Sequence, residues 1–137
     1  MKYIVAAILS FIAVAANADV GDQYINFGGV SYHLLDHHAN DFNPGIGYEK
    51  QVSDQWTVGL GEYKNSLRNK SFYIGGRYTW KRDFILGGDL GGGVMVVNGY
   101  LNDVKMPTVQ PYVDVCWKYG CFMTVGYVSA FNLRMRF

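Results

Sequence analysis

Apolar and polar positions alternate along most of the chain after residue 18. The clearest alternation lies in residues 70–81, where Phe72, Ile74, Tyr78 and Trp80 share one face and the residues between them are mostly polar or glycine. A period of two is typical of a β-strand with two unlike faces. By this pattern, strands are predicted at residues 23–33, 44–52, 55–64, 70–81, 84–98, 108–118, 121–128 and 131–137.

The connections between these strands alternate in length. Short turns are predicted at 53–54, 81–83 and 119–120, longer polar loops at 34–43, 65–69 and 99–107, and a short last turn near 129–130. An even number of strands, with short turns at one end and longer loops at the other, is typical of a bacterial outer-membrane barrel. The predicted fold class is therefore all-β, an eight-stranded antiparallel transmembrane β-barrel of the outer-membrane type. A soluble β-sandwich is the alternative.

The first 18 residues have the organisation of a secretory signal peptide. Lys2 precedes an apolar block, and Ala16-Asn17-Ala18 matches an A-x-A cleavage site. The block is shorter than the ~20 residues that a helix needs to span a bilayer, which argues against a membrane anchor. We therefore expect an exported protein, cut before Asp19, with a single outer-membrane barrel domain at 19–137.

Charged and aromatic residues fit this topology. A net charge of +1 argues against a nucleic-acid-binding protein, which would carry a basic face. The polar strand faces are predicted to place Glu49, Arg77, Asp89, Asp114, Arg134 and Arg136 in the lumen. Aromatic girdles are predicted from Trp56, Trp80, Phe84 and Trp117 at the short turns and from Tyr32, Tyr63 and Tyr100 at the other rim.

The only two cysteines, Cys116 and Cys121, flank a tight turn. In an exported protein they meet an oxidising compartment, which permits a disulfide. A shift of one residue in strand register would instead turn one of them to the other face of the sheet. A disulfide and two unpaired thiols therefore both stay open.

Residues with catalytic chemistry collect in two of the longer loops. A serine close to a histidine is activated as a nucleophile, or the histidine deprotonates a substrate hydroxyl directly. Ordinary solvated loop residues are the alternative. His33, Asp36, His37 and His38 are also ligand types for a transition metal, but no second cluster completes a site, and no metal is predicted. The candidates are His33, Asp36, His37, His38, Asn40 and Asn43 in the first loop and Asn65, Ser66, Arg68, Asn69 and Lys70 in the second.

Several short segments occur in an order that resembles the lipid A palmitoyltransferase (PagP) family and its shorter bacterial and phage relatives. They are Ser31-Tyr32-His33, residues 43–49, 63–66 and 73–80, the glycine-rich fifth strand, residues 97–100 and the terminal Arg136-Phe137. The resemblance covers nearly all of the chain after residue 18. It implies an outer-membrane barrel that moves a palmitoyl chain from a phospholipid donor to lipid A and needs no cofactor.

The resemblance also implies roles for individual residues. The family's histidine after the first strand matches His33, and its serine in the second outer loop matches Ser66. The family's aspartate position holds Asn65, which orients a neighbour by hydrogen bonding but lacks the charge that stabilises an imidazolium. Either Asp36 compensates, or the activity is weaker or different. Pro44 and Pro111 mark places where strand pairing is expected to weaken, since proline removes a ladder donor.

The function predicted from the sequence is acyl transfer to lipid A or another outer-leaflet lipid by a membrane-embedded monomer. His33 is the expected general base, Ser66 assists or orients, and Asn65 holds the geometry. Arg68 and Lys70 are expected to attract lipid phosphates by charge. Two alternatives stay open: a lipid A deacylase that uses the same residues with water as acceptor, and a non-catalytic structural or adhesive surface barrel.

Overall fold

The computed structural model describes residues 21–36, 39–100 and 106–137. The predicted signal peptide and two loop histidines, His37 and His38, lie outside the described residues. No helix in the described ranges is long and apolar enough to cross a membrane. The strands are β1 (Gln23–His33), β2 (Gly45–Gln51), β3 (Trp56–Lys64), β4 (Lys70–Ile85), β5 (Gly88–Asn98), β6 (Pro107–Cys116), β7 (Gly120–Val125) and β8 (Val128–Arg136).

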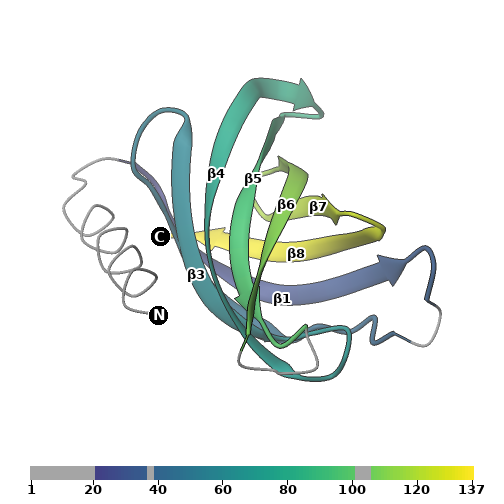
Figure 1. The fold of residues 1–137 in the computed structure, drawn as a ribbon. Coiled ribbons are helices and arrows are strands. Elements are labelled where there is room, and N and C mark those ends of the chain that lie inside the picture. The colour runs from purple at the N-terminus through teal and green to yellow at the C-terminus, as the bar shows by residue number, and fades with distance from the viewer. Residues whose placement is uncertain (1–20, 37–38, 101–105) are drawn as a thin grey trace.

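These strands form one closed barrel in which each strand is antiparallel to the next along the chain (Figure 1). The barrel closes where β1 pairs with β8, from Tyr24 opposite Arg136 to His33 opposite Val128. Closure removes the two unpaired edges that an open sheet would expose. The predicted fold class, an all-β eight-stranded antiparallel barrel, is confirmed.

The barrel carries apolar side chains on its outer surface and polar ones in its lumen. On β4, Phe72 and Trp80 are each 54% exposed, whereas Ser71 is fully buried and Arg77 is 8% exposed. This is the reverse of a soluble β-sandwich, which buries its apolar faces. It suits a barrel whose outer wall faces an apolar medium. The buried hydrophobic residues in the described part of the chain are Val58, Val97, Cys116 and Cys121.

The turn predicted at residues 81–83 is wrong. Strand β4 continues to Ile85, which pairs with Gly88, so the turn is Leu86–Gly87. Both turn residues have positive φ, 50° at Leu86 and 75° at Gly87, as a two-residue type I′ hairpin requires. The charged run at 81–83 looks like a turn by composition, but the register shifts within the hairpin keep it in the strand.

The last turn is also displaced from its predicted position at 129–130. Val125 pairs with Val128, so Gly126 and Tyr127 form the turn and Ser129 lies inside β8. Gly126 adopts a φ of 56°, a conformation that favours glycine. The turn remains short, as expected.

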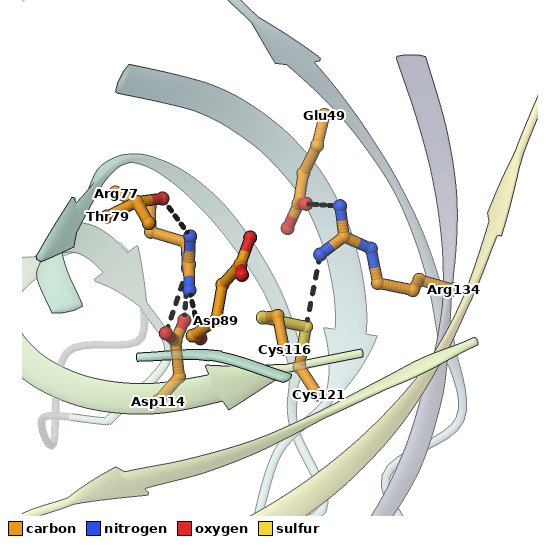
Figure 2. The surroundings of a disulfide bond; sticks show 8 residues. All are labelled: Glu49, Arg77, Thr79, Asp89, Asp114, Cys116, Cys121 and Arg134. Carbon is orange, nitrogen blue, oxygen red and sulfur yellow. Dashed lines mark hydrogen bonds and ion pairs between the residues drawn. A yellow bond between two sulfur atoms is a disulfide. The ribbon is translucent and has the colours of Figure 1, made fainter. Parts of the chain in front are cut away.

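The two cysteines are joined by a disulfide, so of the two possibilities left open by the sequence, the unpaired thiols are excluded. Cys116 on β6 lies directly opposite Cys121 on β7, with their Cα atoms 4.1 Å apart. Trp117 N–H donates to the Gly120 carbonyl at 2.8 Å and closes the turn between them. The disulfide therefore links β6 and β7 at the short-turn end of the barrel (Figure 2).

Charged side chains fill the lumen near this disulfide, as predicted, and they are paired (Figure 2). Arg77 Nε donates to both carboxylate oxygens of Asp114 at 2.8 and 2.9 Å, and its other nitrogens bond Thr79 and the carbonyl of Asp89. Arg134 lies 3.9 Å from Glu49. Arg136, at the end of β8, instead remains 61% exposed and pairs with Asp22 at 2.9 Å. The floor of the lumen, at the short-turn end of the barrel, thus holds charged side chains whose opposite charges nearly cancel.

Candidate functional site

His33, the last residue of β1, lies between an aspartate and a serine. Its Nδ1 is 3.0 Å from Asp41 Oδ1, and its Nε2 is 2.6 Å from Ser66 Oγ. One neutral tautomer satisfies both contacts, with Nδ1–H donating to the carboxylate and Nε2 accepting the serine proton. The side chain of His33 is 7% exposed and that of Asp41 is 64% exposed. The structure therefore brings the two predicted residues, His33 and Ser66, into direct contact.

Asp41 reaches His33 because its loop runs beside β1 as an added short stretch of strand. Ser31 N–H donates to the Asp41 carbonyl at 2.7 Å, and Asn43 N–H donates to the Gly29 carbonyl at 2.9 Å. This approach depends on a bulge in β1. A Cβ atom at Gly28 would lie 2.0 Å from the Asn43 carbonyl oxygen, so that position accepts only glycine without a backbone shift.

Ser66 is held by a turn built around Asn65, whose side chain is fully buried. Asn65 Oδ1 accepts the backbone N–H groups of Leu67 and Asn69, each at 2.9 Å. Its Nδ2 donates to Ser71 Oγ at 2.9 Å and to the Gly99 carbonyl at 2.8 Å. Asn65 thus orders the serine loop through bonds directed away from the histidine.

The two loops are also joined to each other. Asn40 N–H donates to the Ser66 carbonyl at 2.9 Å. Asn43 Nδ2 donates to the Lys64 carbonyl at 3.0 Å, just before the serine turn. These bonds fix the loop that carries Asp41 relative to the turn that carries Ser66. The spacing of the three side chains is therefore set by backbone contacts and does not depend on the side chains alone.

Two tyrosines lie beside the serine. The hydroxyls of Tyr63 and Tyr100 are 2.8 Å apart, and Ser66 lies close enough to Tyr100 to influence its pKa. Burial raises the pKa of Tyr100, while the neighbouring Tyr63 and Ser66 lower it less. Both tyrosines line the lumen cavity, so their prediction as outward girdle residues is wrong. Tyr63, near the end of β3, and Tyr100, in the loop after β5, both face the lumen.

A cavity of about 380 Å³ extends from this site into the lumen. At its mouth lie Ser66 and Tyr100, along its wall Tyr73 and Met95, and at its floor Arg77 with its partner Asp114. Its size falls at the lower end of the range for small-molecule pockets. The site thus opens onto an internal chamber. The wall of this chamber has both polar and apolar side chains, and its far end holds charged ones.

One seam of the barrel wall is incomplete beside this chamber. The ladder between β6 and β7 pairs residues from Val113 with Thr124 to Cys116 with Cys121. In the described ranges, the part of β6 before Val113 has no β7 residue opposite it. Pro111 lies in this stretch, as its missing ladder donor predicts. Gln110 and Tyr112 from the same stretch line the cavity.

The two predicted phosphate-binding residues differ in availability. Arg68 is exposed at the tip of the serine loop, where it adopts a φ of 64°. Lys70 Nζ lies 2.8 Å from Glu62 and 5.3 Å from the centre of the Phe72 ring. The charge of Lys70 is therefore already paired on the outer wall. Arg68 is the better placed of the two to meet a phosphate.

The arrangement supplies a nucleophile, a base and an orienting carboxylate, the set used for acyl transfer. Sequence reasoning named Asp36 for the carboxylate and missed Asp41, although both follow His33 in one loop. No group of three or more metal-ligand side chains occurs in the described residues. No protein-family model matches the sequence, and no curated protein matches it significantly. The chemistry therefore has to be argued from the residues.

Proposed function

We propose that this protein is an outer-membrane acyltransferase that moves an acyl chain from a phospholipid to a hydroxyl of lipid A. The observation that carries the proposal is the contact chain of Ser66, His33 and Asp41, which lies at one rim of a barrel and opens onto an internal cavity. The order of motifs that resembles the lipid A palmitoyltransferase family supports the same substrates.

The outer wall supports a place in the outer membrane. Its exposed side chains include Phe72, Trp80, Val109, Phe131 and Leu133. In water such a surface would promote aggregation, whereas in a bilayer it would contact the apolar lipid chains. The long loops, which carry the site, would then lie at the outer leaflet, where lipid A is found, if the strand ends follow the usual orientation of such barrels.

The contacts suggest the following reaction. His33 Nε2 takes the proton of Ser66 as Oγ attacks the ester carbonyl carbon of the donor. The ester C–O bond breaks, and the lysophospholipid alkoxide leaves with the proton from His33. A lipid A hydroxyl then gives its proton to His33 and attacks the acyl-serine, and Oγ leaves and recovers that proton. Asp41 holds the tautomer and balances the charge on the imidazolium.

The cavity and the open seam provide a path for the donor chain. An acyl chain that passes between β6 and β7 above Val113 would enter the chamber directly beneath Ser66. The head group would stay at the rim, near Arg68. The charged floor formed by Arg77 and Asp114 would stop the chain, because burying a methyl terminus against a paired charge gains nothing over water.

The test is mass spectrometry of lipid A from cells that express the wild-type protein, His33→Ala, Ser66→Ala or Ser129→Ala at equal outer-membrane abundance. Ser129→Ala is the matched control. Ser129 lies in β8 at the same end of the barrel, and its hydroxyl is hydrogen-bonded to Thr124 and not to His33. We expect an added acyl mass with the wild type and Ser129→Ala, and none with the other two.

Other outcomes favour the alternatives. A lost acyl mass that depends on His33 and Ser66 would identify a deacylase, in which water replaces the lipid A hydroxyl. Unchanged lipid A in every strain would refute both lipid A enzymes and leave a barrel that presents its loops to a partner. Fractionation of the wild-type protein away from the outer membrane would refute the proposed location.

A further inference from the structure

The three residues that follow Ser66 offer no free backbone N–H group to stabilise an oxyanion. In serine acyl transfer the carbonyl oxygen becomes negative in the transition state, and donors aimed at it are a large part of catalysis. Here the N–H of Leu67, the residue after the serine, already donates to Asn65 Oδ1. The N–H groups of Arg68 and Asn69 are also used inside the turn. A side chain beside Ser66 would therefore have to supply a donor in place of these three N–H groups.

The phenol of Tyr100 is the side-chain donor in the right place. Tyr100 and Ser66 line the same cavity, and Ser66 lies close enough to Tyr100 to influence its pKa. Burial raises its pKa, so the phenol keeps its proton and remains a donor. Tyr100 has no other role in the acyl transfer described above.

Tyr63 is placed to orient Tyr100. Their hydroxyls are 2.8 Å apart, and the Tyr63 ring packs against Tyr73 with centroids 6.0 Å apart. If Tyr63 donates to Tyr100, the proton of Tyr100 is free to point toward the substrate, and the chain of two hydroxyls polarises each bond in it. This would leave the Tyr100 proton directed at the space above Ser66.

We propose that Tyr100 is a catalytic residue whose O–H donates to the oxyanion formed when Ser66 attacks an ester, and that Tyr63 positions it. This rests on the proposed ester chemistry at Ser66. As Oγ bonds to the carbonyl carbon, the π electron pair moves to the carbonyl oxygen, and the Tyr100 hydrogen bond strengthens. The pair returns when the alkoxide leaves. Tyr100 keeps its proton throughout, so the step needs no further reactant.

The experiment measures hydrolysis of p-nitrophenyl octanoate by the purified full chain in detergent micelles. The variants are Tyr100→Phe, Tyr63→Phe and Ser66→Ala, with Tyr127→Phe as control, because Tyr127 is an exposed tyrosine in the β7–β8 turn. Tyr100→Phe is expected to lower kcat by about 100-fold, the usual loss for one oxyanion donor, with KM little changed. Tyr63→Phe should lower kcat less, and Tyr127→Phe not at all.

The outcomes separate this inference from the proposed function. A Tyr100→Phe enzyme with kcat within threefold of the wild type would overturn the role of Tyr100 while leaving Ser66 chemistry intact. A wild-type protein that neither cleaves the ester nor is labelled at Ser66 by a fluorophosphonate would overturn both. If Tyr100→Phe also loses the heat-dependent gel shift of the folded barrel, misfolding explains its low kcat, and Tyr100→Trp is measured in its place. A folded Tyr100→Trp protein with kcat within threefold of the wild type would overturn the role of Tyr100, and a folded one with a large fall in kcat would support it.

Discussion

The contact between His33 and Asp41 makes a sharp prediction for Asp41→Asn. The substitution keeps the size of the side chain and removes its charge. In the proposed reaction, Asp41 holds the histidine proton on Nδ1 and faces the imidazolium that forms when Ser66 loses its proton. With asparagine, the amide either donates to Nδ1 and inverts the tautomer or turns its oxygen inward without charge. In both cases the transition state loses an electrostatic partner.

The exposure of Asp41 sets the size of the effect. Two unit charges about 4 Å apart interact by about 1 kcal/mol in bulk water and by about 4 kcal/mol at an effective dielectric of about 20. His33 is 7% exposed and Asp41 is 64% exposed, so the pair lies between these limits. A loss near the middle, about 2.7 kcal/mol, corresponds to about 100-fold in kcat. It is smaller than the roughly 10⁴-fold seen where the triad aspartate is buried.

The assay is ester cleavage in detergent micelles, with kcat and KM measured for the wild type and Asp41→Asn. Asp54→Asn is the matched control, because it removes one exposed carboxylate in the turn between β2 and β3, at the end of the barrel opposite the loops that carry the site. We expect kcat to fall by about 100-fold in Asp41→Asn and to stay unchanged in Asp54→Asn. A kcat for Asp41→Asn within threefold of wild type, with Ser66→Ala inactive, would refute the argument that Asp41 serves the histidine.

Two further predictions concern stability. Asn65→Ala removes the hydrogen bonds of a fully buried side chain and should lower the free energy of unfolding by about 2–4 kcal/mol; a wild-type urea midpoint in micelles would contradict it. Asp114→Leu leaves Arg77 buried without its carboxylate and should cost about 3–5 kcal/mol. The double variant Asp114→Leu with Arg77→Met should recover most of that loss, and a double variant less stable than Asp114→Leu would contradict the pairing argument.

The strands were predictable because one physical rule acts along each of them. In a barrel, every second residue faces the outer medium, so the apolar alternation marks all eight strands from local sequence alone. The turns at Leu86–Gly87 and Gly126–Tyr127 were misplaced because turn composition is a weaker signal. Lys81, Arg82 and Asp83 are polar residues that nonetheless extend β4. Only the pairing partner of Ile85 shows where the strand ends.

The site was predictable only in part. The contact of His33 with Ser66 follows from two rim loops that face one another in a barrel of this order. The position of Asp41 does not, because it depends on the backbone bonds from Ser31 to Asp41 and from Asn43 to Gly29, along a bulge at Gly28. That pairing joins residues that local periodicity cannot relate. Tyr100 and Tyr63 were placed on the wrong face because a tyrosine near a strand end suits either a girdle or a lumen.

The geometry also explains why residue 65 is an asparagine while the carboxylate comes from position 41. The side chain at 65 is fully buried and donates through Nδ2 to Ser71 Oγ and to the Gly99 carbonyl. An ionised aspartate has no donor and would face that carbonyl oxygen with a negative charge, which is costly without solvent. Position 65 therefore requires an amide to order the serine loop. In the proposed reaction, the charge that balances the His33 imidazolium is supplied separately, by Asp41, whose side chain is 64% exposed.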